Sequence, residues 1–241
     1  MGSETELKFQ LDPVALQQLR RHPLLGRLKQ EKARTRLEKS AYFDTAEGHL
    51  RAQGAVLRIR TIGRRRIQTL KTTDEKAGAW SRNEWEWDIF DDVPDLRLLT
   101  DTPLAETIGQ TNLQAVFSTE IRRTTYLLSE PGWTVELALD QGQVLAGPYS
   151  APVTEAELEL KSGDADHLFQ LALSLTQNLS ARLSLLTKAK RGFALLEQAP
   201  LTSSKARTIS LDGAMNATAA LRQIALSCIA HFVTNQDYLA M

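Results

Sequence analysis

The chain is poor in cysteine, and this limits the kinds of site that it can build. Cys228 is the single cysteine among 241 residues, so an internal disulfide framework and a cysteine-rich zinc site are both excluded. The four histidines show no metal-ligand spacing. A chain that uses so little cysteine is typical of a reducing compartment, and we expect a cytoplasmic protein.

Long apolar runs and an excess of one charge are also lacking. The N-terminus is charged by residue 4 and no long apolar run follows, so we expect no signal peptide. No uninterrupted stretch approaches the roughly 20 apolar residues that span a bilayer. The 29 basic and 29 acidic residues cancel, which gives no case for a nucleic acid or an acidic membrane as partner. Hydrophobic residues at 42% and charged residues at 24% are ordinary for a globular protein.

Between about residues 32 and 161 the dominant pattern is the two-residue alternation of β-strands. Residues 55–62 alternate most cleanly, and Gly63 with the following arginines predicts a turn into a return strand over residues 67–72. Residues 92–115 contain prolines and short apolar pieces, which predicts loops or short helices. Asp140-Gln141-Gly142 is typical of a hairpin turn, and we expect a turn there.

Helical patterns stand at both ends of this strand-rich region. Asp12 before Pro13 is typical of a helix start. Residues 164–179 predict an amphipathic helix. Residues 201–211 read as a linker, and residues 212–241 predict a further helix. A lone amphipathic helix has nothing to bury itself against, so we expect it to open a second, helical domain. Its apolar face is expected to carry Leu221, Ile224, Cys228 and Phe232.

Charged residues recur at alternate positions, so that strand after strand has one charged face. At the N-terminus, Glu4, Glu6 and Lys8 share a face, and neighbouring carboxylates repel unless a cation offsets them. The acidic members of the pattern are Glu4, Glu6, Glu84, Glu86, Glu136, Asp140, Glu157 and Glu159. The basic members are Lys8, Arg58, Arg60, Lys71, Arg82, Arg123 and Lys188.

Two architectures explain such a pattern. Any one strand fits an antiparallel sheet with its apolar face on the core and its charged face in water. Six or seven such strands also fit a closed barrel with a charged interior and an apolar outside covered by helices. An interior with both signs of charge suits a small polyanion held by Arg and Lys, with carboxylates holding Mg²⁺ or Mn²⁺.

At these residues the chain resembles the CYTH superfamily, also called the triphosphate tunnel metalloenzymes. Glu4-Thr5-Glu6-Leu7-Lys8 matches its N-terminal signature, and Arg58-Ile59-Arg60 looks like its arginine strand. Single residues that match further elements are Lys71, Arg82, Glu84, Arg123, Asp140, Glu157, Glu159 and Lys188. The resemblance covers about residues 1 to 197. Within the family, the chain is similar to bacterial inorganic triphosphatases in which a CYTH domain precedes a helical CHAD domain.

The resemblance implies an α+β fold: an eight-stranded antiparallel β tunnel, closed as a barrel, with a charged interior and helices packed outside. Residues 1–200 would form this tunnel domain and residues 201–211 a linker. Residues 212–241 would be the first helix of a CHAD-like domain.

The resemblance also implies an enzyme that hydrolyses inorganic triphosphate with Mg²⁺ or Mn²⁺. Phosphate oxygens would be bound by Lys8, Arg58, Arg60, Lys71, Arg82, Arg123 and Lys188. Metals would be held by Glu4, Glu6, Asp140, Glu157 and Glu159. The catalytic group would comprise Glu4, Glu6, Lys8 and Lys188, whereas Glu84 and Glu136 have no defined role.

Two alternatives remain open at this point. The substrate of a family enzyme could instead be a nucleoside or thiamine triphosphate, or the activity that of an adenylyl cyclase. The chain could also be a non-catalytic polyphosphate-binding module. The intact acidic set argues against this last reading, because binding alone would need the basic residues more than the carboxylates.

Overall fold

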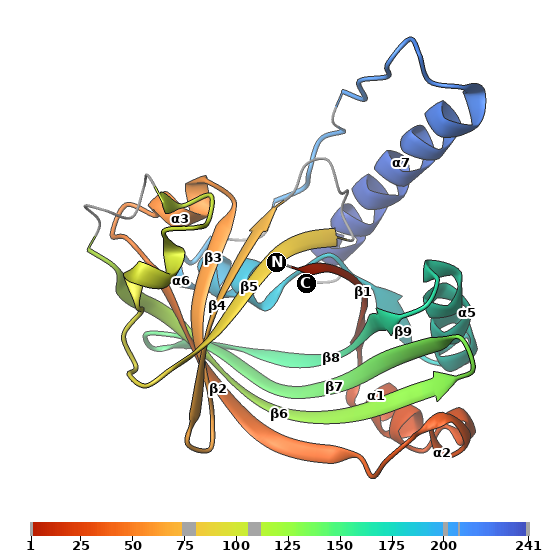
Figure 1. Ribbon diagram of the computed structural model, residues 1–241, viewed down its shortest axis with the longest axis horizontal. Coiled ribbons are helices and arrows are strands. Elements are labelled where there is room, and N and C mark those ends of the chain that lie inside the picture. Colours follow the sequence, from red (N-terminus) through yellow and green to blue (C-terminus); the bar gives the residue numbers. More distant parts are fainter. Residues whose placement is uncertain (1, 74–80, 106–111, 200–201, 207, 240–241) are drawn as a thin grey trace.

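The nine strands that the structure describes form one antiparallel sheet, accompanied by helices (Figure 1). The structure is a computed structural model and describes residues 2–73, 81–105, 112–199, 202–206 and 208–239; the side chains of residues 2–4, 73, 81 and 82 lie outside that description. The α+β class expected from the sequence is confirmed.

The strands are β1 (Gly2–Leu11), β2 (Arg34–Asp44), β3 (Ala55–Ile62), β4 (Arg65–Thr73), β5 (Ser81–Ile89), β6 (Gln114–Glu130), β7 (Trp133–Ala146), β8 (Tyr149–Ser162) and β9 (Ala181–Leu183). The helices are α1 (Pro13–Arg20), α2 (Pro23–Leu28), α3 (His49–Ala52), α5 (Ala165–Thr176), α6 (Lys188–Leu196), α7 (Ala217–Leu239) and the 3₁₀ helix η1 (Leu96–Leu99).

The strand order is β5-β4-β3-β2-β6-β7-β8-β1-β9, and β5 also pairs with β1. That additional pairing joins Gly2–Thr5 of β1 to Ser81–Glu84 of β5. The sequence predicted eight strands, and the ninth is the three-residue β9, which pairs with the end of β1 through Phe9 and Leu183. Three residues are too few to show an alternation, so the pattern could not reveal β9.

One face of β1, β7 and β8 is apolar and carries the larger core. Leu7, Leu137 and Leu158 occupy paired positions on these three strands and are buried. Helices α1, α2 and α5 supply the opposing layer, which Figure 1 shows beside the strands. The stripe expected for residues 164–179 is confirmed, because α5 buries Leu168, Leu171, Ala172 and Leu175.

The expected start of the first helix is also confirmed. Asp12 has an extended backbone, and its carboxylate accepts a hydrogen bond of 2.7 Å from the backbone N–H of Ala15. Pro13 takes the first helical position, where it has no hydrogen bond to lose. This cap fixes where β1 ends and α1 begins.

The turn expected at Asp140-Gln141-Gly142 is wrong, because these residues lie inside the continuous strand β7. Gly142 is opposite Ile121 of β6, and a Cβ atom there would lie 2.0 Å from the backbone oxygen of Glu120. The glycine therefore permits a close approach of two strands. The connection between β7 and β8 instead contains Gly147, whose φ of +56° suits glycine.

Helix α6 covers one end of the charged face of the sheet. Ile121 and Phe117 lie two and six residues before Arg123 in β6, so all three share a face. Ile121 and Phe117 form a buried apolar cluster with Tyr42 and with Ala189 of α6. Gly192 makes this approach possible, because a Cβ atom there would lie 2.2 Å from the Phe117 ring. The packing of α6 places Lys188, its first residue, beside the charged side chains.

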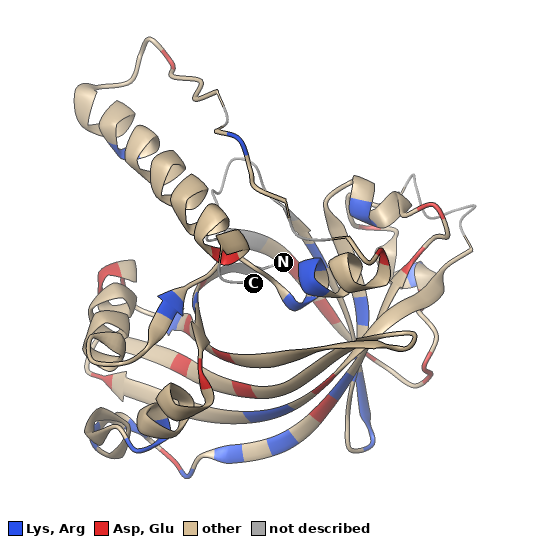
Figure 2. Cartoon of the chain, turned by 180° about the vertical axis from the view of Figure 1, so that it is seen from behind, with Lys and Arg blue, Asp and Glu red and all other residues tan. Residues whose placement is uncertain are grey.

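Helix α7 is mostly exposed, and Figure 2 shows how little charge it carries. Leu221 and Phe232, expected on one apolar face, are each 67% exposed, so the described part of the chain does not cover that face. By length and composition alone, α7 is apolar enough to cross a membrane. A count of uninterrupted apolar residues missed this, because polar residues interrupt the helix.

Candidate functional site

The strand register gathers the alternating charges on one face of the sheet. Lys8 of β1 is opposite Glu157 of β8, and Gln10 is opposite Glu155. Asp140 of β7 is in turn opposite Glu155, and Arg123 of β6 is opposite Asp140. Figure 2 shows acidic and basic positions close together along these strands. Residues far apart in sequence thus form one continuous charged surface.

The centre of this surface is the side-chain ammonium of Lys188. Its Nζ atom lies 2.7 Å from Oδ2 of Asp140 and 3.0 Å from Oε1 of Glu157, and it also contacts Glu155. Asp140 and Glu155 are completely buried. Buried carboxylates require such compensation, since an unpaired buried charge is very costly. Gln10 adds a hydrogen bond of 3.0 Å to Oε2 of Glu155.

Arg123 is the second cation of the group. Its Nε and Nη2 atoms donate to the two oxygens of Asp140 at 2.7 and 2.6 Å, which is the two-point contact that only a guanidinium offers. Nη2 also donates to Glu157. Arg122, its neighbour in β6, is exposed. The inward direction of Arg123 agrees with the strand alternation.

The electrostatic balance of the group keeps both signs of charge in place. Burial opposes ionisation of Glu157, but the attraction of Lys188, Arg123 and Lys8 outweighs it and holds the pKa well below its ordinary value. Burial likewise opposes the charge on Lys188, but Asp140, Glu155 and Glu157 raise its pKa well above the ordinary value. Burial also opposes ionisation of Asp140, but the attraction of Lys188 and Arg123 lowers its pKa. The group is therefore a fixed array of ionised side chains.

Acidic residues on this face could hold a metal ion, but not all of them are equally suited. Ligand atoms of Asp140, Glu155 and Glu157 lie within 4.8 Å of one another. Lys188 already contacts all three, so a cation occupies the position that a metal would take. Oxygen ligands for Mg²⁺ or Mn²⁺ are better supplied by carboxylates whose neutralisation is less complete.

A second row of carboxylates lies on the same face of the sheet. Glu6 of β1, Glu159 of β8 and Glu136 of β7 stand opposite one another on adjacent strands. Like charges at directly opposite positions destabilise a sheet. Lys8 lies 3.8 Å from Glu6, and the part-exposed Lys161 lies 2.6 Å from Glu159. Hard oxygen ligands in such a row fit a divalent cation.

The basic residues of β3 and β4 form the other part of the surface. Arg60 lies 2.8 Å from Glu86 and 3.5 Å from Glu38, and Lys71 lies 3.3 Å from Glu84. Arg58 is half-buried, and burial works against its charge, but Tyr42 and Glu84 raise its pKa. The guanidinium groups of Arg58 and Arg60 remain charged at every physiological pH, as binding of an anion requires.

Two expected site residues cannot be placed, and two residues of the group were missed. The side chains of Glu4 and Arg82 lie outside the described residues, although their backbones pair between β1 and β5. Glu155 extends the alternation of Glu157 and Glu159 by one step, which was a usable signal. Glu38 is buried and contacts Arg36 at 2.6 Å, in a strand whose pattern is mixed.

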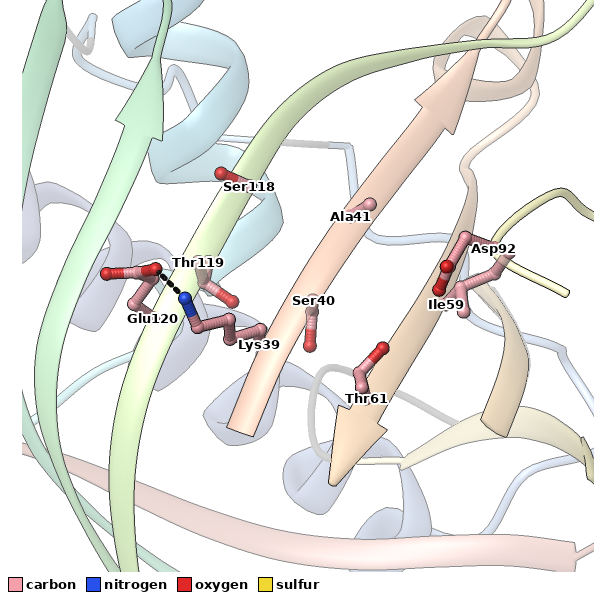
Figure 3. Close-up of a pocket in the computed structure, with 9 residues that line it drawn as sticks. All are labelled: Lys39, Ser40, Ala41, Ile59, Thr61, Asp92, Ser118, Thr119 and Glu120. Atoms are coloured by element: carbon pink, nitrogen blue, oxygen red, sulfur yellow. Dashed lines mark ion pairs between the residues drawn. The ribbon is translucent and has the colours of Figure 1, made fainter. Parts of the chain in front are cut away.

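The pocket of Figure 3 lies apart from this charged face. Its floor includes Ala41, Ile59 and Ser118, which pair across β2, β3 and β6 on the opposite face. Figure 3 shows the ion pair of 2.6 Å between Lys39 and Glu120 at its edge. The pocket has a volume of about 170 Å³, and it does not contribute to the charged face.

Comparison with known proteins places this site in a family. The CYTH domain family matches residues 2–193. An inorganic triphosphatase of Haemophilus influenzae is 34% identical over 158 residues, which are 65% of this chain and 45% of that protein. The chain therefore spans less than half the length of this curated relative.

Solved structures show the same fold at lower identity. A Hippeastrum protein, studied as an adenylyl cyclase and described as having a dominant triphosphatase activity, is 20% identical, with a TM-score of 0.54 over 81% of this chain and 95% of that one. A Bacillus halodurans protein, described as a candidate adenylate cyclase, is 20% identical, with a TM-score of 0.52 over 80% of this chain and 100% of that one. The match over residues 2–193, which is most of the chain, shows that this chain belongs to the CYTH domain family.

Proposed function

We propose that this protein is an enzyme that hydrolyses inorganic triphosphate to pyrophosphate and phosphate in a metal-dependent reaction. The observation that carries the proposal is that one face of the sheet holds both a group of carboxylates with their cations and a second group of basic residues. Arg123 and Lys188 stand among carboxylates, and Arg58, Arg60 and Lys71 lie on strands further along. A short polyanion needs such cations along its length. The curated triphosphatase relative supports the same substrate class.

We infer that the charged face lines a tunnel. The pairing of β1 with β5 supports this, because it links the first strand of the sheet order to the eighth. The sheet would then enclose the charged side chains, with the apolar face and its helices outside. In a site withdrawn from water, each ion pair with phosphate is stronger than at an open surface.

The residues then divide into two tasks. Arg58, Arg60, Arg82 and Arg123 would bind phosphate oxygens, for which a guanidinium offers paired donors, and Lys71 and Lys188 would add single charges. Lys8 lies 3.8 Å from Glu6 and 3.5 Å from Glu157, and its charge offsets both carboxylates. Glu4, Glu6 and Glu159 would hold Mg²⁺ or Mn²⁺ directly, whereas Asp140 and Glu157, which Lys188 contacts, would hold it through water. A bound metal would supply charge neutralisation and an activated water.

The catalytic assignment follows from these positions. Glu4, Glu6, Lys8 and Lys188 would surround the phosphoryl group that is transferred to water. Glu136 and Glu84 complete the acidic wall, the first beside Glu159 and the second beside Lys71. Phosphoryl transfer requires positioning and charge stabilisation more than covalent chemistry by the protein, and a rigid ionised array provides both.

The domain organisation is also a proposal. Residues 1–200 would form the tunnel domain and residues 201–211 a linker, and residues 212–241 would begin a helical CHAD-like domain. We place the protein in the cytoplasm, with inorganic triphosphate or a related polyphosphate as its partner and no nucleic acid or membrane.

A phosphate-release assay tests the proposed function. Inorganic triphosphate, ATP, thiamine triphosphate and long-chain polyphosphate would each be supplied with Mg²⁺, with Mn²⁺, and with a chelator. We expect metal-dependent release, fastest from inorganic triphosphate. Faster release from ATP or thiamine triphosphate would reassign the substrate. Polyphosphate binding without release from any compound would show a binding module in place of an enzyme.

A further inference from the structure

The segment between β9 and α6 is held at both of its ends, and it carries Lys188 into the charged face. The backbone N–H of Ser184 donates a hydrogen bond of 2.9 Å to the backbone oxygen of Lys8 in β1. The hydroxyl of Ser184 accepts a hydrogen bond of 3.1 Å from the N–H of Leu186. Thr187 then caps α6, accepting from the N–H of Lys190 at 3.0 Å. The segment is thus tied to the strand of the N-terminal signature.

Helix α7 supplies the second attachment through one side chain. Oδ2 of Asp237 accepts hydrogen bonds from the backbone N–H groups of Leu185 and Leu186, at 2.9 and 3.0 Å. Asp237 is only 5% exposed. Its other oxygen, Oδ1, is buried and has no hydrogen-bond partner among the described residues. A buried carboxylate is costly, so the two N–H groups are what stabilise Asp237 at this position.

The rest of α7 does not explain this contact. The side chains of Asn235 and His231 bind the backbone of Ser204, which lies in the segment before α7. Val233 is buried, whereas Leu221 and Phe232 are exposed. Among the described residues, the hydrogen bonds from α7 to the segment that carries Lys188 are those of Asp237.

We propose that Asp237 is a positioning residue for Lys188. It fixes the two peptide groups that precede Thr187, and these set where α6 begins and where the Lys188 ammonium lies. That ammonium contacts three carboxylates, so a shift of the start of α6 would move it relative to all three. The proposal rests on the proposed function, because Lys188 belongs to the proposed triphosphate site. It makes α7 a structural part of that site.

The test compares variants of the full chain in steady-state hydrolysis of inorganic triphosphate. Asp237→Ala removes the acceptor, and Asp237→Asn keeps a carbonyl oxygen that can accept from the same two N–H groups. Asn235→Ala is the matched control, since it loosens α7 from Ser204 without touching residues 184–187. Hydrogen exchange at the amides of Leu185 and Leu186 is measured in parallel, since it reports the contact without any turnover.

We expect Asp237→Ala to lower kcat/KM by between about tenfold and about a hundredfold, as small displacements of a catalytic group do. Asp237→Asn should restore most of the rate, and the two amides should exchange faster only where the acceptor is lost. Asn235→Ala should leave both readouts unchanged. If Asp237→Ala does not fold, Asp237→Glu, which shifts the carboxylate by one methylene, should show a smaller loss in the same direction.

A folded Asp237 variant with faster amide exchange but full turnover would overturn the positioning role and leave the proposed function intact. An equal loss of turnover in Asn235→Ala would also overturn it, because the effect would then belong to α7 as a whole. A wild-type protein that releases phosphate from no triphosphate would instead reject the proposed function, and the amide exchange would still test the contact.

Discussion

Lys188 and Asp140 form an ion pair of 2.7 Å, although one begins helix α6 and the other lies in the middle of strand β7. Their side chains are nearly or completely buried, at 10% and 0% exposure. The pair connects the helix that covers one end of the charged face to the strands that build it. Because Arg123, Glu155 and Glu157 join the same group, five charges depend on the position of one helix.

Replacing Lys188 with Met should destabilise the protein and abolish turnover. Three carboxylates would lose their shared cation, and removal of one partner from a buried ion group costs about 3–5 kcal/mol. Urea unfolding measures the free-energy change. Lys32→Met is the matched control, because Lys32 is exposed and the same chemical change there should alter stability by less than about 0.5 kcal/mol. Equal stability of the two variants would show that the ion group contributes little.

The stability of the protein should decline at both ends of the pH scale. The pKa of Glu157 lies well below its ordinary value of 4.5, so its contribution is complete above that pH and is lost as the pH falls towards the folded-state pKa. The pKa of Lys188 lies well above its ordinary value of 10.5, so its contribution is complete below that pH and is lost as the pH rises towards the folded-state pKa.

Denaturant midpoints measured from pH 2 to 12 check this dependence. The wild type should show a plateau from about pH 5 to about pH 10 and a loss of stability outside it. In Lys188→Met the alkaline loss should be smaller, because the group that deprotonates there is gone. An unchanged alkaline limb in this variant would contradict the assignment to Lys188.

Gly192→Ala should displace α6. A Cβ atom at this position would lie 2.2 Å from the Phe117 ring, so the helix or the ring must move. Overpacking of this kind costs about 1–3 kcal/mol. Turnover should fall as well, because Lys188 is one turn away in the same helix. Gly26→Ala in α2 is the control, since a Cβ atom there meets nothing within 4 Å and should be tolerated. Crystal structures of the two variants would show whether α6 has moved.

The sequence revealed which strands carry charges but not all of their partners. Alternation placed Glu157 with Glu159, and Asp140 with Glu136, on one face of their own strands, because a strand's period of two is a local property. Arg123 was assigned from its match to the family motif. It failed at Gly142, which resembles a turn residue but serves a close approach between β6 and β7. The contact of Lys188 with Glu155 depends on how α6 packs against Phe117, and such a non-local contact leaves no periodic signal.

Glu6 gives the most direct test of the central claim, that carboxylates on this face hold the metal for triphosphate hydrolysis. Phosphate release from inorganic triphosphate would be measured over a Mg²⁺ titration for the wild type, Glu6→Gln and the exposed control Glu47→Gln. We expect Glu6→Gln to remain folded, by an unchanged circular dichroism spectrum, and to lose at least about a hundredfold in turnover, as removal of a transition-state charge stabiliser does. Glu47→Gln should match the wild type. Full metal-dependent turnover by folded Glu6→Gln would contradict the account.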